Sequence, residues 1–157
     1  IRIIRPVQYF GYRAYFAREN YVTAAMAFES CTVCMIPMEL IEKFLRKNGN
    51  LALFFIQMLS LDLGIADQRV VNLTQKHVRG RLAESLLGLK DSYGLEEDGA
   101  TINIYLARED LASLSNMTTS NAIRTLSNFV NERIIAIDGR KIKIIDEERL
   151  HKISRMG

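Results

Sequence analysis

The sequence lacks several features on which common protein classes depend. Its 157 residues include no tryptophan, two prolines, two cysteines and two histidines. Two cysteines are too few for a disulfide-stapled extracellular domain, so we expect reduced thiols. Phosphate-binding GxxxxGK(S/T) and dinucleotide-binding GxGxxG patterns are absent, and no nucleophile stands beside a base. We therefore predict a protein that is not an enzyme and has no cofactor.

The charge of the chain is nearly balanced. Lys and Arg number 21 against 18 Asp and Glu, which gives a net charge of +3 and an isoelectric point near 9.0. This permits a nucleic-acid partner without requiring one. We find no signal peptide and no apolar run that we expect to span a membrane, and predict a cytoplasmic protein with no membrane partner. Because the strand-like start Ile1–Arg5 lacks a Met, we expect a longer parent protein.

Two short helical patterns separated by a polar turn lie within residues 106–131. Leu111 and Leu114 give the first helix its apolar stripe. Asn116 tolerates the left-handed backbone of a sharp turn, and Thr118 can cap the second helix. Four apolar residues of the second helix should face the first: Ala122, Leu126, Phe129 and Val130. The residues left outside carry hydrogen-bonding groups and one cation but no carboxylate, which suits phosphates and base edges: Thr119, Ser120, Asn121, Arg124 and Asn128.

A hairpin pattern follows the second helix. Alternating isoleucines on both sides of Asp138–Gly139 are a strong signal for two antiparallel strands. Arg140, Lys141 and Lys143 stand at or beside the tip, where we expect them to be free to contact phosphates. Together these elements predict a winged helix-turn-helix. The alternative is a helical hairpin and a β-hairpin that merely pack together.

With these elements in place, the chain resembles the Crp/Fnr superfamily of bacterial transcription regulators over essentially its whole length. The segment LAREDLASL…TTSNAIRTL…IIAIDGRKIKII carries most of the resemblance. The resemblance implies an α+β fold with a partial β-roll of the cyclic-nucleotide-binding kind, a long dimerisation helix and a winged helix-turn-helix domain. The implied domains are residues 1–73, with the dimerisation helix at about 50–73, and residues 74–157.

The function implied by the resemblance is sequence-specific DNA binding. A homodimer would bind an inverted-repeat operator in double-stranded DNA, with RNA polymerase and an unidentified small-molecule effector as further partners. The family's base-contacting positions match Thr119, Ser120 and Arg124, of which Arg124 alone keeps the usual residue type. The predicted DNA-binding set is Thr118, Thr119, Ser120, Asn121, Arg124, Arg140, Lys141 and Lys143. The alternative function is a ligand-sensing or protein-interaction module whose winged helix does not bind DNA.

Residues 6–37 correspond to the remaining part of the sensor roll. We expect strands at 21–29 and 32–37. By resemblance, residues 11–25 occupy the place of the phosphate-binding cassette of the cyclic-nucleotide-sensing members. In those members a Glu binds the ribose and an Arg-Ser pair binds the phosphate, and the matching positions here are Tyr12, Val22 and Thr23. Losing the Arg removes a charge-assisted hydrogen bond worth about 1.5–3 kcal/mol, so we predict no cyclic AMP response. The expected effector-binding set is Gly11, Tyr12, Arg13, Val22 and Thr23.

Cys31 and Cys34 form a C-x-x-C pattern. On a strand, residues three apart point to opposite faces and cannot chelate one metal ion. A zinc site also needs two more ligands, and His77 and His151 are distant from both cysteines in the sequence. We therefore predict buried free thiols and no metal site.

The segment 50–73 predicts a helix that is apolar on more than one face. One face would cover the sensor roll and the other would pair with a second copy of the chain. The alternative is a buried core helix. We expect a hinge at Leu73–Thr74 before a helix over 75–95, a strand at 101–106 that pairs with the wing, and a final helix with Leu150 and Ile153 on its inner face.

Overall fold

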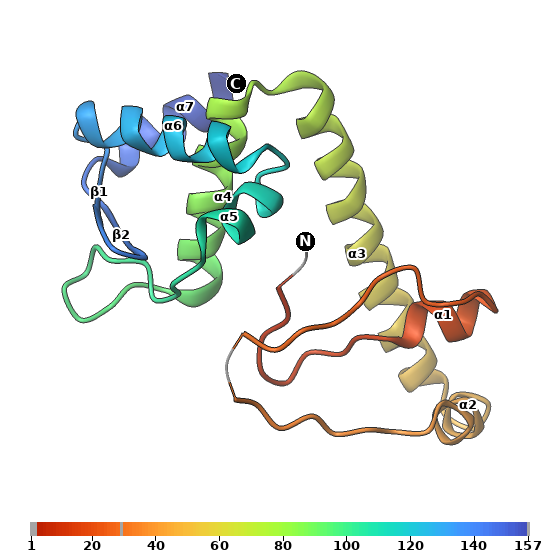
Figure 1. Ribbon diagram of the computed structural model, residues 1–157. Coiled ribbons are helices and arrows are strands. Elements are labelled where there is room, and N and C mark those ends of the chain that lie inside the picture. Colours follow the sequence, from red (N-terminus) through yellow and green to blue (C-terminus); the bar gives the residue numbers. More distant parts are fainter. Residues whose placement is uncertain (1–2, 29, 157) are drawn as a thin grey trace. The chain divides into compact units, whose positions relative to one another are not determined.

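The computed structural model describes residues 3–28 and 30–156, which divide into two compact units (Figure 1). The first unit contains residues 3–64 and the second contains residues 65–156. The long helix α3 (Gly49–Gln75) contributes to both. The boundary predicted after residue 73 stays a prediction, and the predicted strand residues Ile1 and Arg2 lie outside the described part of the chain.

The N-terminal unit is built from helices α1 (Tyr12–Ala17), α2 (Met38–Leu45) and the first part of α3. Gly11 enters α1 with a φ of 90°, a left-handed conformation that glycine adopts without strain. Aromatic side chains join α1 to α3: the rings of Tyr12 and Phe55 meet edge to face with centroids 5.9 Å apart. The Tyr12 hydroxyl also donates to Asp62 at 2.7 Å, which fixes the start of α1 on α3.

The two segments predicted as strands, 21–29 and 32–37, form no strand in their described residues. Glu29 lies outside the described part of the chain. A β-strand persists where a neighbouring strand supplies hydrogen-bond partners, and the described residues of this unit supply none. The strand prediction is therefore wrong. Cys31 and Cys34 lie in this irregular segment as exposed free thiols, so the prediction that they are buried is also wrong.

Helix α3 exposes most of its apolar side chains, and Asn72 is its one buried residue. By length and composition the helix is apolar enough to cross a membrane, although core helices of other proteins pass the same test. The sequence-based prediction that no apolar run is long enough to span a membrane is therefore wrong. Asp62 interrupts the apolar run, but the mean hydropathy of the segment stays high despite this one charge. Helix α3 continues to Gln75 and the helical break falls at residues 76–77, just after the predicted hinge at Leu73–Thr74, which stays a prediction.

The core of the C-terminal unit lies around helix α4 (Val78–Tyr93), where Leu82, Leu86 and Leu89 are buried. Helix α4 packs against α7 (Glu147–Met156) and against α6 (Thr119–Asn131). Leu150 of α7 is buried as predicted, but Ser154 and not Ile153 is the second buried residue of that helix.

The remaining elements are helix α5 (Arg108–Leu114) and strands β1 (Ile135–Asp138) and β2 (Lys141–Ile144). The strands pair antiparallel, with Ile135 opposite Ile144 and Asp138 opposite Lys141. The segment predicted as a strand at 101–106 pairs with the wing through one bridge, Thr101 to Lys143. Figure 1 shows the hairpin beside one end of α6. The chain is thus helix-dominated with a small antiparallel sheet, in agreement with the predicted α+β class.

Candidate nucleic-acid interface

The turn between α5 and α6 has the local geometry that the sequence predicts. Asn116 has a φ of 50°, and the Thr118 side chain caps α6 by accepting a hydrogen bond from the amide of Asn121 at 3.3 Å. Helix α5 begins after Ala107, which provides no side-chain cap. The turn therefore places the N-terminus of α6 at a fixed angle to α5.

Arg81 of α4 holds this turn in place, a role that sequence reasoning missed. Its guanidinium donates to the carbonyl oxygens of Ser115 at 3.2 Å and Asn116 at 3.1 Å. The same group donates to the Lys76 carbonyl at 2.8 Å, in the break between α3 and α4. A half-buried Arg reaching backbone carbonyls leaves no sequence pattern, because its partners are carbonyl groups that every residue carries.

Helix α6 buries Ala122, Thr125, Leu126 and Phe129 against the rest of the unit. The prediction that Val130 faces α5 is wrong, since 38% of its surface is exposed. Val130 is one residue past the buried Phe129 and so lies about 100° around the helix. Ile123 is also exposed, and both residues line a shallow groove with Ile137 of β1.

The outward face of α6 carries hydrogen-bonding side chains and no carboxylate. Its exposed or half-buried polar residues include Thr119, Ser120, Asn121, Arg124 and Asn128. The Arg124 guanidinium donates to the side-chain oxygen of Asn121 at 2.7 Å. This neutral partner orients the guanidinium near the N-terminal half of the helix without cancelling its charge.

The wing has a two-residue loop, Gly139–Arg140, closed by the Asp138–Lys141 pair. Gly139 has a φ of 56°, which the tight loop requires. Arg108 at the start of α5 donates to the Gly139 carbonyl at 2.7 Å and so ties the wing tip to the helix-turn-helix. Arg108 is a second positioning residue that sequence reasoning missed.

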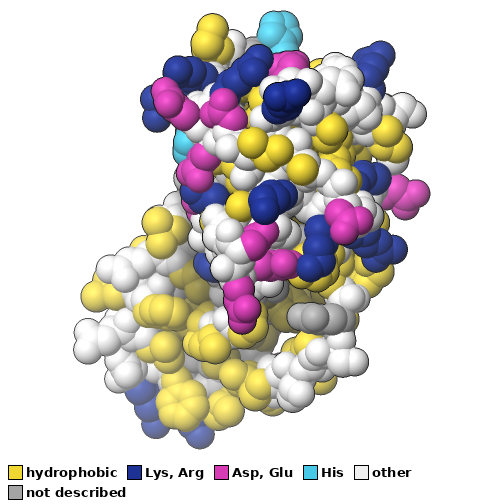
Figure 2. Space-filling model, turned by 90° about the vertical axis from the view of Figure 1, so that its left-hand side faces the viewer, with side chains coloured by type: hydrophobic (Ala, Val, Ile, Leu, Met, Phe, Trp, Pro, Cys, Tyr) yellow, Lys and Arg dark blue, Asp and Glu magenta, His cyan; other side chains and the backbone are white. Residues whose placement is uncertain are grey.

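The prediction that all three wing cations are free is wrong for two of them. The Lys141 ammonium lies 3.1 Å from Glu96, and the Lys143 ammonium lies 3.2 Å from Asp98. Arg140 is exposed and forms no ion pair within the described residues. On the side of the C-terminal unit that carries the wing, Figure 2 shows side chains of both charges interspersed.

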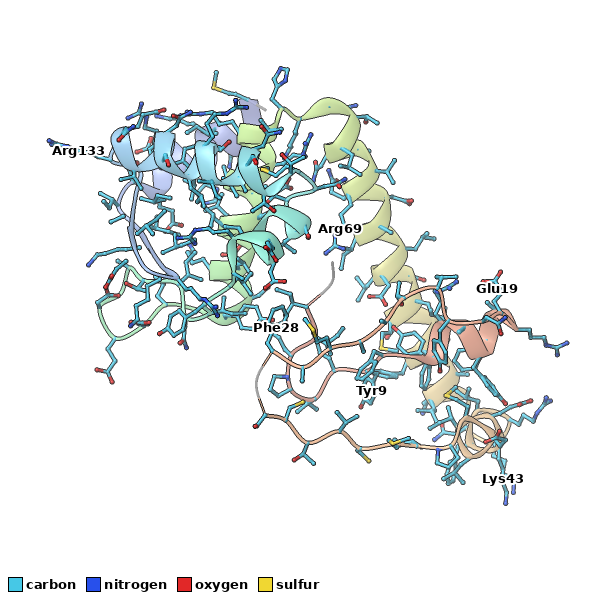
Figure 3. All side chains as sticks on the ribbon, in the orientation of Figure 1. Tyr9, Glu19, Phe28, Lys43, Arg69 and Arg133 are labelled. Carbon is cyan, nitrogen blue, oxygen red and sulfur yellow. The ribbon has the colours of Figure 1, made fainter. Side chains whose placement is uncertain are left out.

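One further cation lies beside the interface. Arg133 follows the C-cap of α6 with a left-handed φ of 58°. Its side chain is exposed and points away from the unit (Figure 3). No sequence pattern points to Arg133, because it falls between the predicted helix and the predicted hairpin.

The expected effector-binding residues are divided between two kinds of local structure. Gly11, Tyr12 and Arg13 lie at the start of α1, where Tyr12 is buried and Arg13 pairs with Glu19 at 3.3 Å. Val22 and Thr23 are exposed in the irregular segment that follows. Within the described residues, no three His, Cys, Asp or Glu side chains are grouped closely enough to hold a metal ion.

Comparisons with known proteins agree with this geometry. Residues 80–153 match the family model of the Crp-like helix-turn-helix domain. The chain is 30% identical over 140 residues to the anaerobic regulatory protein of Bacillus subtilis, a match that covers 88% of this chain and 59% of that protein. Residues 80–153 belong to the Crp-like helix-turn-helix domain family. A second relative is the CRP-like cAMP-activated global transcriptional regulator of Mycobacterium tuberculosis, 22% identical over 99% of this chain and 70% of that protein.

Solved structures share the fold. FixK2 from Bradyrhizobium japonicum superposes with a TM-score of 0.66 at 22% identity, covering 73% of this chain and 57% of that one. A CRP/FNR-family regulator from Thermus thermophilus gives a TM-score of 0.59 at 22% identity, covering 64% of this chain and 52% of that one. The chain thus spans a little over half the length of the Bacillus subtilis relative and of these two proteins.

Proposed function

We propose that this Crp/Fnr chain belongs to a cytoplasmic transcription regulator that binds an inverted-repeat DNA operator as a homodimer. The observation that carries the proposal is the outward face of α6. It presents the Arg124 guanidinium and four polar side chains with no carboxylate, on a helix whose opposite face is buried. Arg is the side chain that most often recognises guanine, through two parallel hydrogen bonds.

In this proposal the two parts of the interface have different tasks. Arg124 contacts a guanine edge, and Thr119, Ser120 and Asn121 make shorter contacts to bases or phosphates. Thr118 caps the helix and Arg140 contacts a phosphate from the wing tip, with Lys141 and Lys143 beside it. Two recognition helices related by a two-fold axis would lie about 34 Å apart, one turn of B-DNA.

Dimerisation through residues 50–73 is supported by the exposed apolar surface of α3. Ile56, Leu63 and Val70 are each more than half exposed. They lie at spacings of seven residues, so they form one stripe along the helix. A second copy of the chain would remove this stripe from water, and the symmetry of an inverted repeat requires such a two-fold seam.

We also propose that the regulator does not respond to cyclic AMP. The resemblance implies a phosphate-binding Arg at the position of Val22, and the exposed, uncharged Val22 side chain cannot neutralise a cyclic phosphate. Tyr12 stands at the position of the ribose-binding Glu, and its hydroxyl is already bonded to Asp62. Millimolar cyclic AMP should leave the thermal unfolding temperature unchanged, whereas ligand at a hundred times its dissociation constant would add about 2.7 kcal/mol. The M. tuberculosis relative named as cAMP-activated is the positive control.

One observation favours the alternative function. Ile123 and Val130 leave an apolar groove open beside the outward face of α6, and such a surface also suits a protein partner. Selection from random-sequence duplexes separates the two functions. Enrichment of an inverted repeat with half-sites one helical turn apart supports DNA recognition, and failure to enrich any sequence supports the protein-interaction module.

A further inference from the structure

We propose that the acidic turn, residues 95–101, competes with DNA phosphates for the wing lysines and so lowers sequence-independent DNA binding. The inference rests on the proposed function, because it concerns how the wing of the same interface binds DNA phosphates. It starts from two ion pairs that join this turn to β2, Glu96 with Lys141 and Asp98 with Lys143.

Glu96 holds Lys141 through a small network. The Lys141 ammonium lies 3.1 Å from each carboxylate oxygen of Glu96, and the Tyr105 hydroxyl donates to the same carboxylate. The ammonium also lies 5.1 Å from the centre of the Tyr105 ring, within the range of a cation–π contact. The hydrogen bonds from Tyr105 and Lys141 lower the pKa of Glu96, and the hydrogen bond with Glu96 raises the pKa of Lys141. The pair is therefore fully charged at neutral pH.

Asp98 is anchored before it meets Lys143. Its carboxylate accepts the backbone amides of Ala100 at 3.0 Å and Thr101 at 2.8 Å, and the Thr101 hydroxyl at 2.8 Å. These hydrogen bonds, led by the Thr101 amide, hold the pKa of Asp98 far below its usual range. The carboxylate thus stays ionised, and the turn fixes its direction.

Backbone hydrogen bonds keep the acidic turn against the wing. The Ile102 amide donates to the Ile142 carbonyl and the Ile144 amide donates to the Ala100 carbonyl, both at 2.9 Å. These bonds lie on either side of the bridge between Thr101 and Lys143. The carboxylates therefore occupy a fixed register beside the lysines, so the pairs do not depend on two freely moving loops.

The arrangement weakens one class of DNA contact selectively. A phosphate that binds Lys141 or Lys143 must displace a carboxylate that already neutralises it, whereas Arg124 is held by the neutral Asn121 side chain. Sequence-independent affinity comes almost entirely from lysine and arginine contacts to phosphates. The acidic turn therefore weakens the phosphate contacts on which binding to arbitrary DNA depends, and leaves the guanine contact proposed for Arg124 unopposed.

The test compares Glu96→Gln with Glu97→Gln in the 157-residue chain. Glu97 lies in the same turn, is exposed and forms no ion pair with any described residue. Its variant removes the same negative charge without breaking an ion pair, which makes it the matched control. Binding is measured to a duplex of arbitrary sequence over a series of salt concentrations, and to immobilised heparin. We expect Glu96→Gln to bind about two- to fivefold more tightly than Glu97→Gln, the range given by an exposed ion pair. Its salt slope should be steeper by up to about 0.9, the value for one added phosphate contact.

Equal behaviour of the two variants would overturn the proposal, because net charge alone would then explain the change. A second comparison uses a Lys141→Ala background, in which Glu96→Gln should act no differently from Glu97→Gln. A persistent difference in that background also overturns the proposal. Heparin and duplexes of arbitrary sequence contain no operator, so this comparison can be made whether or not the protein recognises one. If the protein selects no operator sequence, the proposed function fails, but the comparison between Glu96→Gln and Glu97→Gln remains valid.

Discussion

Arg79 and Glu132 form a two-point contact between α4 and the C-terminal end of α6. The two guanidinium nitrogens of Arg79 lie 2.6 and 2.5 Å from the two carboxylate oxygens of Glu132. Arg149 of α7 donates to the same carboxylate at 3.0 Å. One carboxylate thus joins three helices and fixes the end of the helix that carries the candidate DNA-binding face.

This contact predicts a pH-dependent contribution to stability. The hydrogen bond from Arg79 is the largest cause lowering the pKa of Glu132. A lowered folded-state pKa stabilises the protein above the unfolded-state pKa, about 4.3, and the contribution is lost as pH falls through the folded-state value. Glu132→Gln should lower the free energy of unfolding by about 1 kcal/mol at pH 7, since both side chains are about one-third exposed.

Chemical denaturation at pH 7 and below pH 4 measures this effect. The difference between wild type and Glu132→Gln should shrink at the lower pH. Glu148→Gln is the matched control, because Glu148 pairs with Lys152 on the solvent side of α7 and should contribute little. A difference that stays constant over this pH range would contradict the role assigned to the carboxylate.

The missing cap of α5 predicts a stabilising substitution. Ala107 has extended backbone angles at the N-cap and no side-chain hydrogen bond. Ala107→Ser should raise the free energy of unfolding by about 0.5–2 kcal/mol, since the serine hydroxyl can accept a hydrogen bond from a backbone amide of the first turn. Thr118→Ala should lower it by a similar amount at the start of α6. An Ala107→Ser variant no more stable than wild type in thermal denaturation would be evidence against the assigned cap.

The exposed stripe of α3 predicts a dimer that one charge disrupts. Leu63 is 63% exposed and lies on the proposed seam. Leu63→Glu should produce monomers at micromolar concentration in sedimentation measurements, because a carboxylate would be buried without a partner. Gln75→Glu introduces the same charge at an exposed polar position of α3 and should remain dimeric. A monomeric wild type, or one that sediments with lipid vesicles, would count against the dimer.

The C-terminal unit could be predicted from the sequence in considerable detail. Asn116, Thr118 and Gly139 are residues whose local backbone preferences fix turns and caps, so their structural roles are visible in single positions. The apolar spacing of Leu82 and Leu86 identifies a core stripe in the same way. The resemblance to the Crp/Fnr superfamily is densest in this unit, which is also where the family model matches.

Other features required contacts that no local pattern encodes. The pairs of Lys141 and Lys143 join residues about forty-five positions apart, and charge spacing along the chain does not reveal them. Arg81 and Arg108 bind backbone carbonyls, which all residues share. In the N-terminal unit, strand propensity at 21–37 misled the prediction, because a strand needs a pairing partner as well as suitable side chains.

We propose that α6 reads DNA sequence through Arg124. Parallel selection from one random duplex library, with wild type and with Arg124→Ala, tests this role. We predict that wild type enriches an inverted repeat. Arg124→Ala should lose preference at one base pair in each half-site, at a cost of about 1–3 kcal/mol per half-site. Identical enriched sequences and affinities for the two proteins would contradict the assignment of α6 as the recognition helix.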